Sequence, residues 1–138
     1  MNADCVVVDA NIAFKALAAG HGDLRDRLGP SATVTFFAPR FLFVELFRHK
    51  ERLAQAAKVS EEDVLEALHT LVSRVEFVNE VNIALGTWME AYRLCRDIDE
   101  KDTPYVALTL HLDGRLWTDD AELKNGLKAK GFDRFLDS

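Results

Sequence analysis

The sequence predicts an α/β domain built around a mostly parallel sheet, and three observations support this fold class. Short β-branched runs alternate with longer amphipathic segments, as in folds where a helix connects each strand to the next parallel strand. The run at residues 5–8 is continuously apolar, which is typical of a strand buried on both faces. Acidic residues directly follow this run and the run at residues 116–117, and ligands of parallel sheets bind at such strand ends.

The composition predicts one soluble domain over residues 1–138, since 49% of the residues are hydrophobic and 29% are charged. No apolar run approaches the length of about 18 residues that a transmembrane helix requires. The net charge of −6 argues against a broadly basic surface for phosphate, although a metal in an acidic site would still attract phosphate. Cys5 and Cys95 are predicted to be buried thiols, which fits a reducing, cytoplasmic location.

The first half of the chain is expected to hold two strands and two helices, in the order strand 5–8, helix 10–20, strand 34–37 and helix 39–57. A further helical turn is expected at residues 21–27. Pro39 suits the first turn of a helix, because an N–H has no partner there. The apolar first half of helix 39–57 is expected to be buried, and its second half is expected to reach solvent through basic residues: Arg48, Lys50, Arg52 and Lys58.

The second half begins with Ser60 and Asp63, which resemble a capping box at the start of a helix. The elements expected after it are strand 75–78, helix 81–95, helix 106–112, strand 116–117, helix 121–130 and an edge strand within 132–136. One apolar stripe is predicted to be the buried face of helix 81–95, because its members fall at steps of four and three: Val81, Leu85, Trp88, Tyr92 and Cys95.

Three acidic positions lie at the edges of these elements. Asp9 follows the first strand, and Asp102 precedes Thr103-Pro104 at a helix start. Asp119 and Asp120 follow the predicted strand 116–117. At each position a helix N-cap is the structural alternative to a functional role, and Asn11 could share that duty beside Asp9.

Glu45 is more informative, because its neighbours within residues 41–47 are apolar on both sides. Burial of an unpaired carboxylate costs several kcal/mol or forces the group to remain protonated. A salt bridge to Arg40 or Arg48 is the structural alternative, and we favour a metal ligand or a member of an acid cluster. A divalent metal would account for all of these acids together, since hard cations take oxygen ligands.

Other candidate motifs give weaker signals. The four histidines show no paired ligand spacing, which argues against zinc, and neither a Gly-rich phosphate loop nor a nucleophile elbow is present. The aromatic residues are interpreted as core rather than as a base-stacking platform: Phe36, Phe37, Phe41, Phe43, Phe47, Trp88 and Tyr92.

Taken together, these motifs resemble the PIN-domain family, particularly the compact VapC-type toxins. The resemblance rests on four pieces in this order: Val-Val-Val-Asp9-Ala-Asn11, Glu45 in the second long helix, Asp102-Thr-Pro-Tyr-Val-Ala-Leu, and Leu-Trp-Thr118-Asp-Asp120. The pieces span most of the chain, and their combination is more specific than any one of them. The resemblance implies a three-layer α/β/α sandwich with a central, mostly parallel sheet.

The resemblance also implies a ribonuclease that depends on Mg²⁺ or Mn²⁺ and serves as the toxin of a toxin–antitoxin pair. It makes four acids the catalytic and metal-binding pocket: Asp9, Glu45, Asp102 and Asp120. Thr118 would support this pocket, Asn11 would lie beside it, and Asp99 would be an additional acid nearby. Asp119 stands where many relatives have a small or neutral residue, and spacing favours Asp120 over Asp119 as the ligand.

The partners implied by the resemblance are RNA, a second copy of the chain and a small antitoxin protein. The second copy would pair through helices, with residues of 41–47 or 64–72 at the interface. The antitoxin would insert an Arg into the acidic pocket and displace the metal.

Three other interpretations use similar residues. A haloacid-dehalogenase-like phosphatase would need a second Asp at Asn11, and a phosphoacceptor receiver would need an acid pair beside Asp9 and an aspartate after strand 75–78. Both fit poorly. A non-catalytic PIN-like module, whose acids bind a basic segment of a partner protein, is the alternative that remains open.

Overall fold

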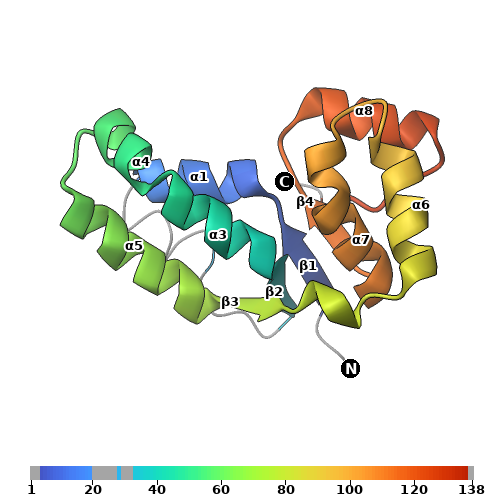
Figure 1. Ribbon diagram of the computed structural model, residues 1–138, viewed down its shortest axis with the longest axis horizontal. Helices are drawn as coiled ribbons and strands as arrows, with labels where there is room; N and C mark the ends of the chain where they lie inside the picture. Colours follow the sequence, from blue (N-terminus) through green and yellow to red (C-terminus); the bar gives the residue numbers. More distant parts are fainter. Residues whose placement is uncertain (1–3, 20–27, 29–32, 137–138) are drawn as a thin grey trace.

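The computed structural model describes residues 4–19, 28 and 33–136, which form a four-stranded parallel sheet flanked by helices (Figure 1). The spatial order of the strands is β3-β2-β1-β4. Their bounds are β1 (Asp4–Val8), β2 (Val34–Pro39), β3 (Val75–Val78) and β4 (Arg115–Trp117). The α/β class predicted from the sequence is therefore confirmed, and the helical turn expected at residues 21–27 lies outside the described residues.

The central strand β1 pairs with β2 on one side and with β4 on the other, so its apolar residues Val6, Val7 and Val8 are fully buried. The chain reaches β4 through a tight turn in which Asp113 adopts a left-handed φ of 52°. A Cβ atom at the next residue, Gly114, would collide with the carbonyl oxygen of Cys5 in β1. Glycine at this position therefore permits the close approach of the turn to β1.

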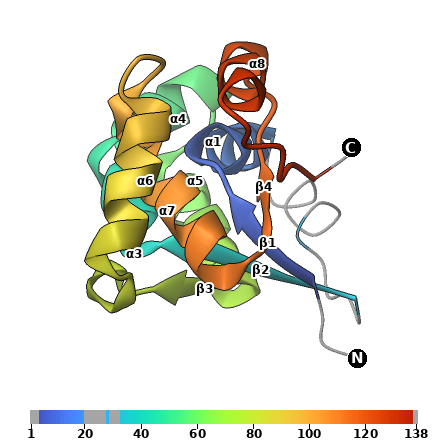
Figure 2. The same cartoon turned by 90° about the vertical axis from the view of Figure 1, so that its right-hand side faces the viewer.

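Helices lie on both sides of the sheet (Figures 1 and 2). One group contains α1 (Ala10–Ala19), α3 (Arg40–Arg48), α4 (Lys50–Ala57) and α5 (Glu61–Arg74). The other group contains α6 (Leu85–Cys95), α7 (Thr103–Leu112) and α8 (Ala121–Ala129), with the short 3₁₀ helices η1 (Glu80–Asn82) and η2 (Glu100–Asp102) preceding α6 and α7. Helix α7 contacts β1, β2 and β4 and is almost entirely buried, which explains why its sequence is apolar all round.

The single helix predicted at residues 39–57 is wrong in two respects. Pro39 is the last residue of β2, where it is extended and opposite Val78, and so it precedes the helix. The helix itself divides at His49, whose φ of −107° and ψ of 14° lie outside the helical region. The ring of His49 packs edge-on against Phe14 with centroids 6.1 Å apart, and α4 lies against α1 and α5.

The expectation that the first half of this segment is buried all round is also wrong. In α3 only Leu42 and Leu46 are buried, whereas Phe43, Val44 and Phe47 are exposed. Phe43 is covered in part, because its ring packs edge-on against that of Phe77 in β3 with centroids 5.9 Å apart. By contrast, the capping box at the start of α5 is confirmed, because Ser60 Oγ accepts from the N–H of Asp63 at 3.2 Å and the Asp63 carboxylate accepts from the N–H of Ser60 at 3.4 Å.

The stripe predicted as the buried face of helix 81–95 is buried only in part, since Cys95 is fully buried and Trp88 is half-buried, whereas its other three residues are exposed. Val81 belongs to η1 and is 85% exposed, Leu85 is 75% exposed, and Tyr92 is also exposed. The face that packs against α7 is made of smaller side chains, namely Ala91, Leu94 and Cys95. Because α6 carries apolar residues on both faces, periodicity alone does not identify the buried one, and the small residues permit the closer helix contact.

The C-terminal segment is less regular than predicted. Helix α8 ends at Ala129, and Gly131 follows with a φ of 92°. An edge strand was expected within residues 132–136. The structure has a single parallel β-bridge there, between Leu116 and Phe135. Within the described ranges, no helix is both long and apolar enough to cross a membrane.

Candidate active site

The topology creates a switch point between β1 and β4. From β1 the chain moves outward through β2 to β3, and it then returns to the opposite side of β1 to form β4. At such a reversal the connections leave the sheet in opposite directions, and a crevice opens beyond the carboxyl ends of the two strands. The N–H of Asp9 donates to the carbonyl oxygen of Trp117 at 3.1 Å, which brings the residues following both strands together at this edge.

Asp9 is the most deeply placed acid of this edge, since only 3% of it is exposed. Its Oδ1 atom accepts from the N–H of Asn11 at 3.2 Å, and its Oδ2 atom accepts from the hydroxyl of Thr118, which follows β4. Burial raises the pKa of Asp9, these two hydrogen bonds lower it, and the nearby charges of Asp120 and Asp119 raise it further. The net shift of the pKa is upward, because burial and the nearby acids outweigh the two hydrogen bonds.

Asp102 stands at the N-cap position of α7, but its side chain makes no capping hydrogen bond. The pKa of Asp102 is raised to about 7. Burial is the largest cause, and repulsion from other acids is the second, namely from Asp9, Asp99, Asp120 and Glu45. The structural alternative considered for this residue, a helix cap, therefore does not account for its side chain. Its carboxylate is half-buried among other acids, which disfavours its ionised form.

Glu45 reaches the same region from the middle of α3. It is half-buried, and its Oε1 atom accepts from the hydroxyl of Tyr105 on α7 at 3.2 Å. No ion pair joins Glu45 to Arg40 or Arg48 among the described residues, so the salt-bridge alternative is not observed there. Burial, and then the charge of Glu45, raise the pKa of Tyr105, so this hydroxyl remains a hydrogen-bond donor.

The adjacent acids Asp119 and Asp120 have different surroundings, since only Asp120 lines the cavity that contains Asp9. Asp120 caps α8, since its Oδ1 atom accepts from the N–H of Leu123 at 3.1 Å, and it also lines the cavity that contains Asp9. Asp119 is exposed and forms an ion pair with Lys15 of α1. The backbone N–H of Asp120 donates to the Thr118 hydroxyl at 3.2 Å, so Thr118 contacts both Asp9 and Asp120.

These side chains line one cavity of about 140 Å³. It brings together six of the eight residues predicted for the site, namely Asp9, Asn11, Glu45, Asp99, Asp102 and Asp120. Thr118 and Asp119 are not part of its lining. Four further residues line it that sequence reasoning missed: Ala10, Phe14, Lys101 and Tyr105. Of these, Tyr105 and Lys101 are neighbours of the Asp102-Thr-Pro motif, and this proximity in sequence is the signal that could have drawn attention to them.

The donor set of the cavity fits a hard divalent cation, because five carboxylates line it and none of them forms an ion pair among the described residues. The side chains as they stand do not form a completed coordination sphere. In the described part of the chain, no three acids, histidines or cysteines lie in an arrangement that would already hold a metal ion. Binding would therefore require the carboxylates to move toward one another.

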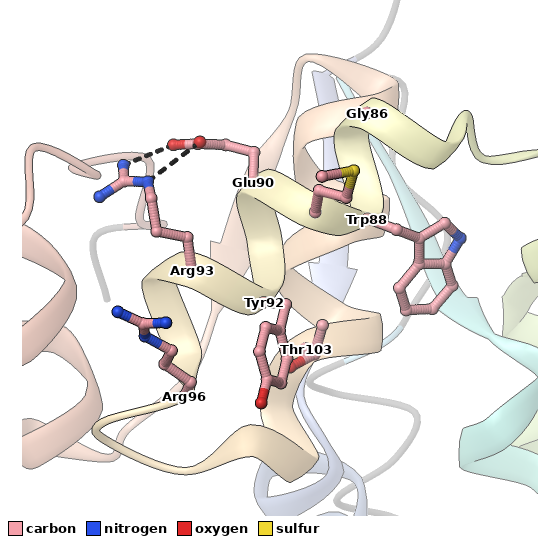
Figure 3. A pocket seen from close by; sticks show the side chains of 8 residues that line it. Gly86, Trp88, Glu90, Tyr92, Arg93, Arg96 and Thr103 are labelled. Atoms are coloured by element: carbon pink, nitrogen blue, oxygen red, sulfur yellow. Dashed lines mark hydrogen bonds and ion pairs between the residues drawn. The ribbon is translucent and has the colours of Figure 1, made fainter.

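A larger hollow, of about 700 Å³, lies along α6 on residues of different chemistry (Figure 3). It is lined chiefly by apolar and basic side chains, including Trp88, Met89, Tyr92 and Arg96. Arg93 in this hollow is held by Glu90 through hydrogen bonds of 2.6 and 3.1 Å. Its lining includes one acid and no convergent set of carboxylates, so we place the candidate chemistry in the smaller, acidic cavity.

Comparison with known proteins agrees with this fold. The family model described as "PIN domain" matches residues 7–136, and the chain therefore belongs to the PIN-domain family. Among solved structures, the chain is similar to a chain in the crystal structure of VapBC2 from Rickettsia felis bound to a DNA fragment from their promoter. That match has a TM-score of 0.60 and 14% sequence identity, and it covers 88% of this chain and 92% of the other. The comparison with curated proteins gave no match.

Proposed function

We propose that this protein is a metal-dependent endoribonuclease that hydrolyses RNA phosphodiester bonds. The observation that carries the proposal is the meeting of acids from separate elements in one cavity at the switch point of the sheet. Asp9 follows β1, Glu45 lies in α3, Asp102 precedes α7 and Asp120 precedes α8. Membership of the PIN-domain family and the similarity to a chain of a VapBC complex support the choice of a nuclease and of RNA as substrate.

The acids differ in the role that their surroundings support. Asp9 and Asp102 are the principal ligands in this proposal, since burial and neighbouring acids raise the pKa values of both carboxyl groups. Glu45 and Asp120 complete the set, the first oriented by Tyr105 and the second by the start of α8. Thr118 holds Asp9 in place, Asn11 contributes its N–H to the same carboxylate, and Asp99 adds negative charge beside Asp102.

Bound Mg²⁺ or Mn²⁺ would supply activation of a water nucleophile and stabilisation of the negative charge that develops at phosphorus. The carboxylates of Asp9, Glu45, Asp102 and Asp120 would hold the ion through oxygen atoms, as hard cations require. The protein supplies no covalent nucleophile in this scheme. Its own contribution is to fix the acids at one edge of a rigid sheet and to place the substrate against them.

The decisive experiment is cleavage of a pooled, labelled RNA with Mn²⁺, with Mg²⁺ and with EDTA, beside a DNA pool of matched sequence. The wild-type protein should cut RNA only when metal is present. Asp102→Asn should reduce the rate by a factor on the order of 10² to 10³, the range seen when one electrostatic contact to a transition state is removed. Circular dichroism should show that the variant remains folded.

Asp133→Asn is the matched control, because Asp133 is an exposed acid outside the cavity, 3.8 Å from Lys128. It should cut at the wild-type rate. Equal rates for wild type and Asp102→Asn, or cleavage that survives EDTA, would contradict the proposal. Binding of Mn²⁺ without any cleavage would favour the non-catalytic, protein-binding alternative.

We also propose two protein partners, as the resemblance to VapC-type toxins implies. A second copy of the chain would cover the apolar groove of about 560 Å³ between α3, α5 and β3, whose lining includes Phe43, Val44, Val72 and Phe77. Light scattering at a concentration on the order of 20 µM should then report a dimer, and Val44→Glu should make it monomeric. A small antitoxin would bind the acidic cavity through an Arg, which matches carboxylates with two parallel hydrogen bonds.

A further inference from the structure

Lys101 has an unusual position among the described residues that line the acidic cavity. Of the ten lining residues, five are carboxylic acids and Lys101 is the cation. A solvated lysine near acids commonly has no role beyond general electrostatics, so its place has to be explained from its contacts.

The backbone of Lys101 is held in η2 between two of the cavity acids. Its N–H donates to Asp99 Oδ1 at 3.0 Å, and the N–H of Asp102 donates to the carbonyl oxygen of Asp99 at 3.1 Å. Neither bond uses the side chain of Lys101, so almost any residue could stand at this position of the turn. The turn therefore explains where Lys101 stands and leaves its side chain unaccounted for.

The side chain of Lys101 is exposed and forms no ion pair within the described part of the chain. Lysines elsewhere in the fold do form such pairs, for example Lys15 with Asp119 and Lys130 with Asp97. Lys101 has acids on the cavity wall beside it and does not pair with them, so its ammonium is available to a ligand at the mouth of the cavity.

We propose that Lys101 binds a non-bridging phosphate oxygen of the RNA where the strand crosses the mouth of the acidic cavity. This inference rests on the proposed function, since it assumes that RNA is the ligand. The chain has a net charge of −6 and five acids in this cavity, so a polyanion is repelled on approach. An ammonium on a flexible stem offers three donors and a full charge, which suits a phosphate whose position varies with sequence.

The test measures RNA binding separately from cleavage. A labelled single-stranded RNA about 15 nucleotides long is titrated in Ca²⁺, a hard cation that takes carboxylate ligands, and a gel checks that the RNA remains intact. Lys101→Ala should raise the dissociation constant of the RNA about 3- to 10-fold. It should also reduce the steepness of the plot of log affinity against log salt concentration by about 0.7, the value for one phosphate contact to a single strand. Lys101→Arg should bind like wild type, because it keeps the charge.

Lys128→Ala is the control of equal charge change, since Lys128 is exposed and lies outside the cavity lining. It should leave the salt slope unchanged. If Lys101→Ala and Lys128→Ala behave alike, or if the wild-type protein binds no RNA, the role given to Lys101 is overturned. If wild type cleaves RNA and Lys101→Ala binds RNA as wild type does, the nuclease proposal stands and only the role of Lys101 is refuted. If RNA binding depends on Lys101 but no RNA is cleaved in Mn²⁺, only the nuclease proposal is refuted.

Discussion

The starts of α7 and α8 are built alike and use their acids differently. Each helix has an aspartate at its N-cap position, Asp102 in one case and Asp120 in the other. Asp120 accepts from a backbone N–H of its helix, whereas Asp102 makes no capping hydrogen bond. Both carboxylates line the same cavity. The Asp120 side chain therefore has a structural role as the cap of α8. The Asp102 side chain does not cap α7, so a functional role is needed to explain it.

The largest expected effect on stability concerns the ionisation of Asp102 in the metal-free protein. The pKa of Asp102 is about 7 in the folded state against an ordinary value of 3.8, so protonation favours the folded state. The stabilisation is complete below pH 4 and is lost as the pH rises to 7 and above. Asp102→Asn, which resembles the protonated acid, should therefore be more stable than wild type at pH 8 by about 1–2 kcal/mol, or roughly 3–6 °C in melting temperature.

This result is checked by thermal melting in EDTA at several pH values between 4 and 8. The two proteins should melt alike near pH 4 and separate progressively as the pH rises. A residual slope is expected in the variant, because the pKa of Asp9 is also raised. Saturating Mn²⁺ should stabilise wild type more than the variant, since it binds the folded state through the ionised acids. A variant that melts below wild type at pH 8 in EDTA would show that Asp102 has a structural partner.

The helix cap at Asp120 gives the next largest effect. Asp120→Ala and Asp120→Asn remove the same charge, but only asparagine keeps an oxygen for the N–H of Leu123. The alanine variant should be less stable than the asparagine variant by about 1 kcal/mol in urea unfolding. At position 102 the same pair of substitutions should differ by less than about 0.5 kcal/mol, since no cap is lost there. An equal difference at both positions would remove the distinction between the two helix starts.

Much of the fold was predictable from sequence because its signals are local. The β-branched run of β1 and the capping box of Ser60 and Asp63 each depend on a few adjacent residues. The strand order was not predictable in the same way, since it depends on contacts between segments far apart in the chain. The PIN-like resemblance implied a central, mostly parallel sheet, which the structure confirms, but it gave no strand order.

The wrong predictions of burial share one cause, which is that an apolar pattern does not show which element covers it. Residues Phe43 and Phe47 of α3, and Leu85 and Tyr92 of α6, have the spacing of core residues and are exposed. Periodicity identifies apolar faces, but burial requires a neighbouring element on each face. The candidate site shows the same limit, because the spacing of the acids suggested a cluster and could not show that Tyr105 donates to Glu45 or that Lys15 pairs with Asp119.

The smallest expected effect concerns Asp119, which is adjacent to Asp120 and exposed in an ion pair with Lys15. Exposed ion pairs contribute roughly 0–1 kcal/mol, so Asp119→Asn should change the free energy of unfolding by about 0.5 kcal/mol or less. It should also leave the rate of RNA cleavage within about twofold of wild type, since one surface charge contributes little to binding. Lys15→Gln, which removes the same pair from the other side, should give the same small change. A tenfold loss of cleavage in Asp119→Asn with no loss in Lys15→Gln would mean that Asp119 turns into the cavity when metal binds, and the division of roles between Asp119 and Asp120 would then be reversed.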